Sequence, residues 1–358
     1  MSATLVEKRA REDDAAGGAA ADAAPKRQCM LEKGVRVSKM TMPGVTNITC
    51  VLASGDGELF VGTRTALYMK TNKRVTLIAG HQSEKGYQDG KGSEARFNEI
   101  SGLALMRDGG IMLVDKYNHS VRLVSPDGEV STVAGTTEKG FVDNCSGYNA
   151  RFNEPHGIVA INEWFLFVSD SSNHCIRRLS RLRGENYWQV HTVCGKGQEN
   201  GYVNGPARGA RFNYPMGLAL NMEEDIIIAD KCNDSVRKFM MSAGRVTTVA
   251  GSLDNGEEVL SSIFTNPFDV AVDGNNSIFV VEDHNDFGLY QISEENGTVL
   301  TIQDQSGKDI VLPTCISIDK KGRLIFCNID DGDCLECPLS VAHARLVAPF
   351  PRHNTNEA

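Results

Sequence analysis

Four cysteines near the end of the chain come closest to the spacing of a metal site. Cys315, Cys327, Cys334 and Cys337 fall within 23 residues, and cysteine thiolates are ordinary zinc ligands. A structural zinc site normally combines two close-set pairs, whereas this stretch has a single Cys-x-x-Cys. Residues 328–333, NIDDGD, resemble a calcium loop in composition but lack the bidentate glutamate at its twelfth position. We therefore expect no cofactor, and the sequence leaves open whether Cys334 and Cys337 bind a metal.

Carboxylate and amide side chains recur along the chain as an Asp-x-x-Asn motif. Oxygen atoms of both types bind calcium, but each copy follows an apolar run, where aspartate and asparagine side chains cap tight turns. We therefore predict a structural role for the motif. Its copies are Asp115 with Asn118, Asp170 with Asn173, and Asp230 with Asn233, followed by a degenerate copy at Asp283 and Asp286.

An internal repeat contains these motifs. An Ala-Gly or Cys-Gly step returns at residues 79, 134, 194 and 250, at spacings of 55, 60 and 56 residues. The tetrapeptide Ala-Arg-Phe-Asn returns at 95–98, 150–153 and 210–213, and in degenerate form at 263–266. Each unit has four short apolar runs separated by turn residues, which indicates a four-stranded antiparallel meander. One such sheet cannot bury both faces, so the copies must pack against one another.

The order of these motifs resembles that of the NHL repeat family. The resemblance is carried by residues 86–90 (GYQDG), 150–157 (ARFNEPHG) and 170–177 (DSSNHCIR), and it covers roughly residues 44–340. It implies an all-β fold, a six-bladed β-propeller of four-stranded antiparallel blades. The expected blades are residues 44–79, 98–134, 153–194, 213–250, 266–302 and 313–340.

The two ends of the chain differ from the repeats. Residues 1–33 contain almost no large apolar side chains, so we expect a disordered, charged and alanine-rich tail. Residues 34–43 include an alternating stretch that we interpret as a strand closing the ring against the last blade, since a propeller leaves no exposed sheet edge. An alternative is closure by residues 344–348, and the sequence does not decide between them. Residues 341–358 are expected to form a C-terminal tail.

Composition limits where the protein acts. The chain has no apolar run of the ~20 residues that span a bilayer and no signal-peptide core, so we expect a soluble, intracellular monomer without membrane contact. Its ten cysteines are then expected to be reduced. Basic clusters at Lys8–Arg11 and Lys26–Arg27 could form a split nuclear-localisation signal. The predicted location is therefore cytoplasmic or nuclear.

In an antiparallel meander, the long loops between blades and the Asp-x-x-Asn turns emerge on the same side, which we call the top face. Four phenylalanines at the loop ends are predicted to wedge between blades: Phe97, Phe152, Phe212 and Phe264. The arginines beside three of them could bind an anionic partner, or each could fold back on its own loop, which we favour because every good repeat has one. We expect the partner-binding patch to come from Tyr87, Phe141, Tyr202, Arg96, Arg151, Arg211, His119 and His174.

The resemblance implies three classes of function. Relatives bind protein or peptide partners, often as substrate receptors of ubiquitin ligases, and others bind single-stranded RNA on a basic top face. RNA is disfavoured here by the net charge of −9. Six-bladed lyases and lactonases hold a metal in the central channel, but the candidates in this chain do not recur and lack an accompanying nucleophile. They are His156, Asn266, Asp269 and Glu282. We therefore expect a non-catalytic interaction scaffold that binds a protein or peptide, and a ubiquitin-pathway adaptor is one form that the resemblance suggests.

Overall fold

The computed structural model describes residues 38–55, 57–185, 187–251, 264–282, 288–293, 298–303, 310, 314–327, 334–338 and 344–349. All of these belong to one unit, Lys33–Ala358. The predicted tail at residues 1–33 lies outside the described residues. Within these ranges, no helix has the length and apolar character needed to cross a membrane.

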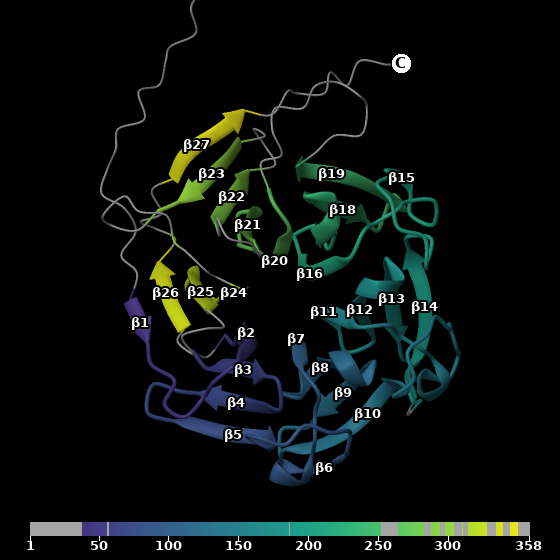
Figure 1. Cartoon of the computed structure of the whole chain (residues 1–358), viewed down its shortest axis with the longest axis vertical. Coiled ribbons are helices and arrows are strands. Elements are labelled where there is room, and N and C mark those ends of the chain that lie inside the picture. Colours follow the sequence, from purple (N-terminus) through teal and green to yellow (C-terminus); the bar gives the residue numbers. More distant parts are fainter. Residues whose placement is uncertain are drawn as a thin grey trace, which may run out of the picture. The chain divides into compact units, whose positions relative to one another are not determined.

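Strands in this unit form six antiparallel sheets in chain order (Figure 1). The first sheet contains β2 (Ile48–Ala53), β3 (Leu59–Thr63), β4 (Ala66–Lys70) and β5 (Val75–Gly80). The second contains β7 (Ile100–Leu105), β8 (Ile111–Asp115), β9 (Ser120–Val124) and β10 (Glu129–Gly135), extended by β6 (Gly90–Lys91). The third contains β11 (Pro155–Asn162), β12 (Phe165–Asp170), β13 (Cys175–Ser180) and β14 (Gln189–Cys194).

The remaining three sheets repeat the same order. The fourth contains β16 (Pro215–Leu220), β17 (Ile226–Asp230), β18 (Ser235–Met240) and β19 (Arg245–Gly251), extended by β15 (Gly205–Pro206). The fifth contains β20 (Pro267–Val272), β21 (Ser277–Glu282), β22 (Leu289–Ser293) and β23 (Thr298–Ile302). The sixth contains β24 (Cys315–Ile318), β25 (Arg323–Cys327) and β26 (Cys334–Pro338).

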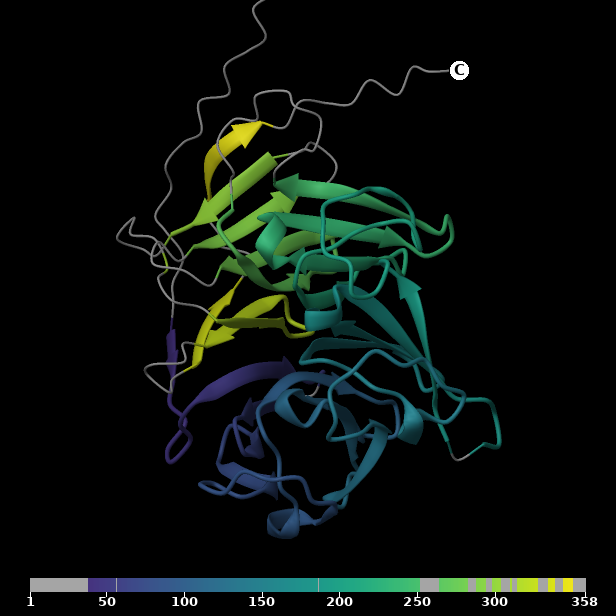
Figure 2. The same cartoon turned by 45° about the vertical axis from the view of Figure 1, so that its right-hand side comes forward.

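The first strands of the six sheets close into a ring. Each contacts the next in the cyclic order β2, β7, β11, β16, β20, β24 and back to β2. Figures 1 and 2 show the sheets following one another around a common centre. The predicted six-bladed propeller of four-stranded antiparallel blades is therefore confirmed, with each sheet forming one blade.

Strands from both ends of the chain complete the outer edges. β1 (Ser38–Met40) pairs antiparallel with β26 and supplies the fourth strand of the sixth sheet. β27 (Ala344–Pro349), the rival candidate for closure, instead pairs with β23 as a fifth strand of the fifth sheet. The ring is thus joined by the N-terminal strand, and the C-terminal strand covers the edge of a neighbouring blade.

The apolar core lies between the blades. Six clusters of buried apolar residues can be distinguished in the described ranges, each formed by two neighbouring sheets. Each of the four predicted wedges lies in one cluster with an exposure of 0 %, and they are Phe97, Phe152, Phe212 and Phe264. Because each sheet buries both faces against its neighbours, its inner strands read as nearly continuous apolar runs.

The recurring Ala-Gly step has a local cause. Gly80, Gly135 and Gly251 end the fourth strands of their blades with φ angles of 91°, 94° and 110°, and Gly195 directly follows β14 with a φ of 86°. This region of φ favours glycine. A Cβ atom on Gly135 would lie 2.3 Å from the carbonyl oxygen of His119. Each step therefore needs a residue without a side chain where the outermost strand leaves the blade.

One expectation about the cysteines is wrong. Cys327 and Cys334 face each other across β25 and β26 and form a disulfide bond, although we expected reduced thiols throughout. The hairpin register brings the two side chains together, which spacing along the sequence did not indicate. Cys334 is therefore not available as a zinc ligand. The calcium-like stretch 328–333 lies outside the described residues.

Candidate functional site

Three buried arginines organise the top face. Arg122, Arg177 and Arg237 occupy the same place in β9, β13 and β18, and each has an exposure of 0 %. Each guanidinium lies 2.7–2.9 Å from the carboxylate of the Asp-x-x-Asn motif in its own blade, Asp115, Asp170 or Asp230. A buried charge is tolerated when it is paired and hydrogen-bonded. Sequence analysis missed this pair, although an arginine stands four residues after the motif's asparagine in all three repeats.

Each motif carboxylate accepts hydrogen bonds from a backbone amide, the motif's asparagine and the buried arginine. In the second blade, Asp115 accepts hydrogen bonds from the Asn98 amide at 2.8 Å, Asn118 Nδ2 at 2.8 Å and Arg122 Nη1 at 2.9 Å. Asn118 also donates to the Gly86 carbonyl of the long loop. Burial raises the pKa of Asp115 to about 6, while these donors and the guanidinium act in the opposite direction. These contacts show that the motif holds the turn and the loop.

The same arginines fasten the long loops between blades. Arg122 bonds Asp89 of the loop and the Gln88 carbonyl, and Arg177 bonds Asp143 at 2.7 Å and the Val142 carbonyl at 2.8 Å. The loop carboxylates in turn accept amide hydrogen bonds from the outermost strand. A 15-residue loop is thereby tied to the blade at several points.

The three predicted contact aromatics lie over these arginines. The rings of Tyr87, Phe141 and Tyr202 lie 4.8, 5.1 and 4.5 Å from the guanidinium carbons of Arg122, Arg177 and Arg237. Each guanidinium carbon also lies 5.0–5.4 Å from the ring centre of a wedge phenylalanine. Cations favour such positions over aromatic faces. The Tyr87 hydroxyl is also bonded to Thr132 at 3.0 Å. The three rings therefore anchor loops, and Tyr87 remains 41 % exposed.

The three predicted contact arginines fold back on their own loops. Arg96, Arg151 and Arg211 pair with Glu84, Glu138 and Glu199 at 2.7–3.0 Å. Arg96 also donates to the carbonyls of Ser93 and Ala95. Asp89 and Asp143 of the same loops bind the buried Arg122 and Arg177 instead. Most of the hydrogen-bonding capacity of Arg96 is used within its loop.

Other blades vary the same arrangement. In the fifth blade, Glu282 accepts the Thr265 amide at 2.7 Å, as Asp115 accepts that of Asn98, and Tyr290 takes the arginine's place with its hydroxyl 3.2 Å from Glu282. The predicted fourth copy of the motif at Asp283 and Asp286 lies outside the described residues. Glu282 thus has a structural partner set and does not face the channel.

Hydrogen bonds join the Asp-x-x-Asn turns of three blades to the next blade on the top face. His119 Nδ1 accepts the Glu154 amide at 3.1 Å, and His174 Nδ1 accepts the Tyr214 amide at 3.2 Å. Asp234 Oδ1 accepts the Asn266 amide at 2.8 Å in the same way. These acceptors end the turns with φ angles of 48–55°, so each turn is joined to the next blade. Burial lowers the pKa of both histidines, which keeps the accepting nitrogen unprotonated.

Two tyrosines on the rim formed by these turns were not singled out from the sequence. Tyr117 lies in the turn η2 (Lys116–Asn118) and is 44 % exposed, and Tyr214 precedes β16 and is 41 % exposed. Lys116 lies 4.7 Å from the Tyr117 ring centre, and His174 packs edge-on against Tyr214 with centroids 4.9 Å apart. Both tyrosines occupy the variable positions of recurring motifs, Asp-x-x-Asn and Asn-x-Pro. An aromatic residue at a variable position of a recurring motif is the sequence signal that could have identified these two tyrosines.

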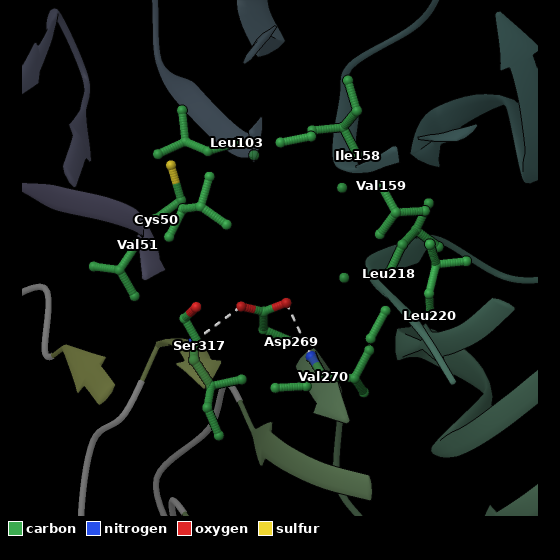
Figure 3. A pocket seen from close by; sticks show the side chains of 18 of the residues that line it. Cys50, Val51, Leu103, Ile158, Val159, Leu218, Leu220, Asp269, Val270 and Ser317 are labelled. Atoms are coloured by element: carbon green, nitrogen blue, oxygen red, sulfur yellow. Dashed lines mark hydrogen bonds between the residues drawn. The ribbon is translucent and has the colours of Figure 1, made fainter. Parts of the chain in front are cut away.

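The central channel contains a cavity of about 330 Å³ lined by all six first strands (Figure 3). Of the four predicted metal ligands, His156 and Asp269 line it, whereas Asn266 and Glu282 belong to the structural contacts above. Across the part of the chain that the structure describes, no group of three or more His, Cys, Asp or Glu side chains could hold a metal ion. The residues therefore do not fit the metal site of the lyase and lactonase class.

The closed ring of six sheets and the recurring buried Asp-Arg pairs define a six-bladed repeat propeller. No family model matches the chain. A stretch of 102 residues is 35 % identical to the chloroplast protein Suppressor of Quenching 1 of Arabidopsis thaliana, and covers 28 % of this chain and 10 % of that protein. Stretches of 95 and 97 residues are 33 % identical to NHL repeat-containing protein 2 of Homo sapiens and Gallus gallus, each covering 26 % of this chain and 13 % of the relative. The chain is an NHL-type propeller.

Solved structures share the fold at low sequence identity. A gluconolactonase from Xanthomonas campestris has a TM-score of 0.56 with 12 % identity, covering 85 % of this chain and 89 % of that one. A virginiamycin B lyase from Staphylococcus aureus has a TM-score of 0.53 with 9 % identity, covering 86 % and 100 %. A chain of the nidogen/laminin complex has a TM-score of 0.51 with 13 % identity, covering 83 % and 93 %. Because enzymes and a binding protein share this fold, the fold itself does not determine the function.

Proposed function

We propose that this propeller is a non-catalytic interaction platform whose top face binds a protein or peptide partner. The observation that carries the proposal is the pair of exposed tyrosines, Tyr117 and Tyr214, on a rim whose turns are fixed to one another by hydrogen bonds. Aromatic side chains on a rigid frame lose little entropy on binding and are enriched at interface centres.

The contact surface we propose differs from the one expected from the sequence. Tyr117, Tyr214, His119 and His174 form it. The aromatics Tyr87, Phe141 and Tyr202 are assigned to holding the loops because their rings cover buried guanidinium groups. The described residues contain no group of three or more metal-ligating side chains, which favours an interaction platform over a metal-dependent enzyme. Service to the ubiquitin pathway remains a prediction.

Affinity capture from lysate, with and without nuclease, tests the proposal. The variants are Tyr117→Ser with Tyr214→Ser, and the control Tyr187→Ser, whose side chain is 39 % exposed in the insertion after β13. We expect a set of protein partners that survives nuclease, is retained by the control and is lost with the rim variant at unchanged melting temperature. Partners retained by the rim variant would contradict the proposed surface. Crosslinked RNA with partners lost on nuclease treatment would favour the RNA-binding alternative.

A further inference from the structure

Asp269 departs from the repeat at a position that is glycine in three other blades. It is the third residue of β20, and the third residues of β7, β11 and β16 are Gly102, Gly157 and Gly217. The first strands approach closely there, since a Cβ atom on Gly102 or Gly157 would lie 2.5 Å from a carbonyl oxygen of the next blade. Glycine satisfies this requirement in three blades. Close approach of the first strands therefore does not account for the carboxyl group of Asp269.

Asp269 also lacks the counter-ion that accompanies the motif carboxylates. Its Oδ1 accepts the Val270 amide at 2.9 Å and its Oδ2 accepts the Ile316 amide at 3.0 Å. No ion pair with a lysine or arginine is found for it among the described residues. Figure 3 shows the carboxyl group directed into the cavity, between the strands of several blades. Surrounding protein raises the pKa of Asp269 to about 7, since burial disfavours the charged form.

The end of the cavity away from the top face is apolar. The last lining residues of the six first strands are all apolar, and they are Leu52, Leu105, Ala160, Leu220, Val272 and Ile318. Each first strand begins near the top-face turns, so these residues surround the opposite end of the channel. The volume of about 330 Å³ lies at the lower end of the range of small-molecule sites. A ligand that fits this cavity would need an apolar body for this end and a polar group that meets the carboxyl group of Asp269.

We propose that the channel cavity binds a small organic cation, a primary or secondary amine with a compact apolar body, whose ammonium group pairs with Asp269. The ammonium group would supply the missing counter-ion and reach carboxylate lone pairs that the two amides leave open. The apolar body would lie against the leucine, isoleucine and valine side chains. A metal ion would need several oxygen or nitrogen ligands, which the cavity does not offer. This site is separate from the proposed top-face surface and does not depend on it.

Titration calorimetry with two matched probes tests the site at about pH 8, where a free carboxyl group and an alkylamine are both charged. Cyclohexylmethylamine carries the required ammonium group, and cyclohexylmethanol has the same body without the charge. We expect the amine to bind the full-length protein at least about tenfold more tightly than the alcohol. The variant Asp269→Asn should lose this preference. The control Glu129→Gln, which removes an exposed carboxylate on the outer strand β10, should keep it.

A second variant covers the case in which Asp269→Asn does not fold. Leu105 is 38 % exposed at the apolar end of the cavity, so Leu105→Lys should fold and should weaken amine binding by placing a like charge beside the ligand. Amine affinity should also fall in the wild type as the pH drops below about 7. His156 and Cys50 line the same cavity, but burial lowers the pKa of the histidine and raises that of the thiol, so neither changes charge in this range.

Each result of these titrations either supports or overturns the proposed amine site. Binding of the amine that is lost or reduced in Asp269→Asn and Leu105→Lys, and kept in the control, supports the site. Equal affinity for amine and alcohol would overturn it, as would an amine affinity that Asp269→Asn and Leu105→Lys leave unchanged. Absence of binding for both probes at about 10 mM, a concentration that detects even a weak complex, would overturn it as well.

Discussion

Replacing Arg177 by methionine tests the buried ion pair that ties loop and blade together. The guanidinium has an exposure of 0 % and lies 2.7 Å from Asp170, which is equally buried. Removing one partner of a buried pair leaves an uncompensated charge and costs about 3–5 kcal/mol. The second partner, Asp143, has a side chain that is 42 % exposed, so solvent screens its share to about 1 kcal/mol or less. We therefore expect the free energy of unfolding to fall by about 3–5 kcal/mol.

Urea denaturation of four proteins measures this effect: the wild type, Arg177→Met, Asp170→Leu and the double variant. The double variant removes both charges, so it should cost less than the sum of the single variants by at least about 1 kcal/mol. The matched control is Arg178→Met on the same strand, whose side chain points to the opposite face and lies over the Phe165 ring. It should change stability by no more than about 1 kcal/mol.

The loss of stability in Arg177→Met should also depend on pH, through the titration of Asp170. Burial raises the pKa of Asp170 to about 6, above its usual unfolded value of about 3.9. The folded state therefore binds more protons in that interval, and protonation favours folding as the pH falls. Loss of Arg177 raises this pKa further, so the cost of Arg177→Met should shrink on acidification. A cost equal to that of Arg178→Met, or one that grows at low pH, would refute the reasoning.

Three further predictions concern the repeat. Phe152→Ala should cost about 3–5 kcal/mol in urea denaturation because the ring is buried between blades, whereas Phe165→Ala, at a 39 % exposed position, should cost far less. His174 has a lowered pKa, so its contribution should be complete above about pH 6.5 and decline as the pH falls through the folded value; His174→Asn should flatten the stability profile between about pH 5 and 7.5. Gly135→Ala should lower the melting temperature more than Gly184→Ala, because both have a positive φ but only the first would meet a carbonyl oxygen.

Much of the fold could be predicted because each recurring residue answers a local requirement. The Ala-Gly step marks a positive φ where the outermost strand ends, and the Asp-x-x-Asn motif marks the turn after the second strand. These requirements act within a few residues, so they leave a readable pattern and set the number and order of strands. The wedge phenylalanines follow for the same reason, since each repeat must fill the same gap.

The site was less predictable because it depends on contacts between distant residues. The recurrence of Arg177 after the motif's asparagine is visible in the sequence, but its burial against Phe141 and Phe152 is not. The sequence also suggested that Tyr87 belongs to an exposed patch, whereas its ring covers Arg122. The disulfide between Cys327 and Cys334 likewise depends on the register of β25 and β26.

The sequence alone thus determined the repeat, the four-stranded unit and the face that carries the long loops, because these follow from local conformation and from the alternation of strands. The tertiary structure decided which charges are buried and which end of the chain joins the ring. It also placed the two rim tyrosines in solvent and Asp269 at the channel cavity. Those outcomes arise only when six blades pack around one axis, since each depends on the blade next to it.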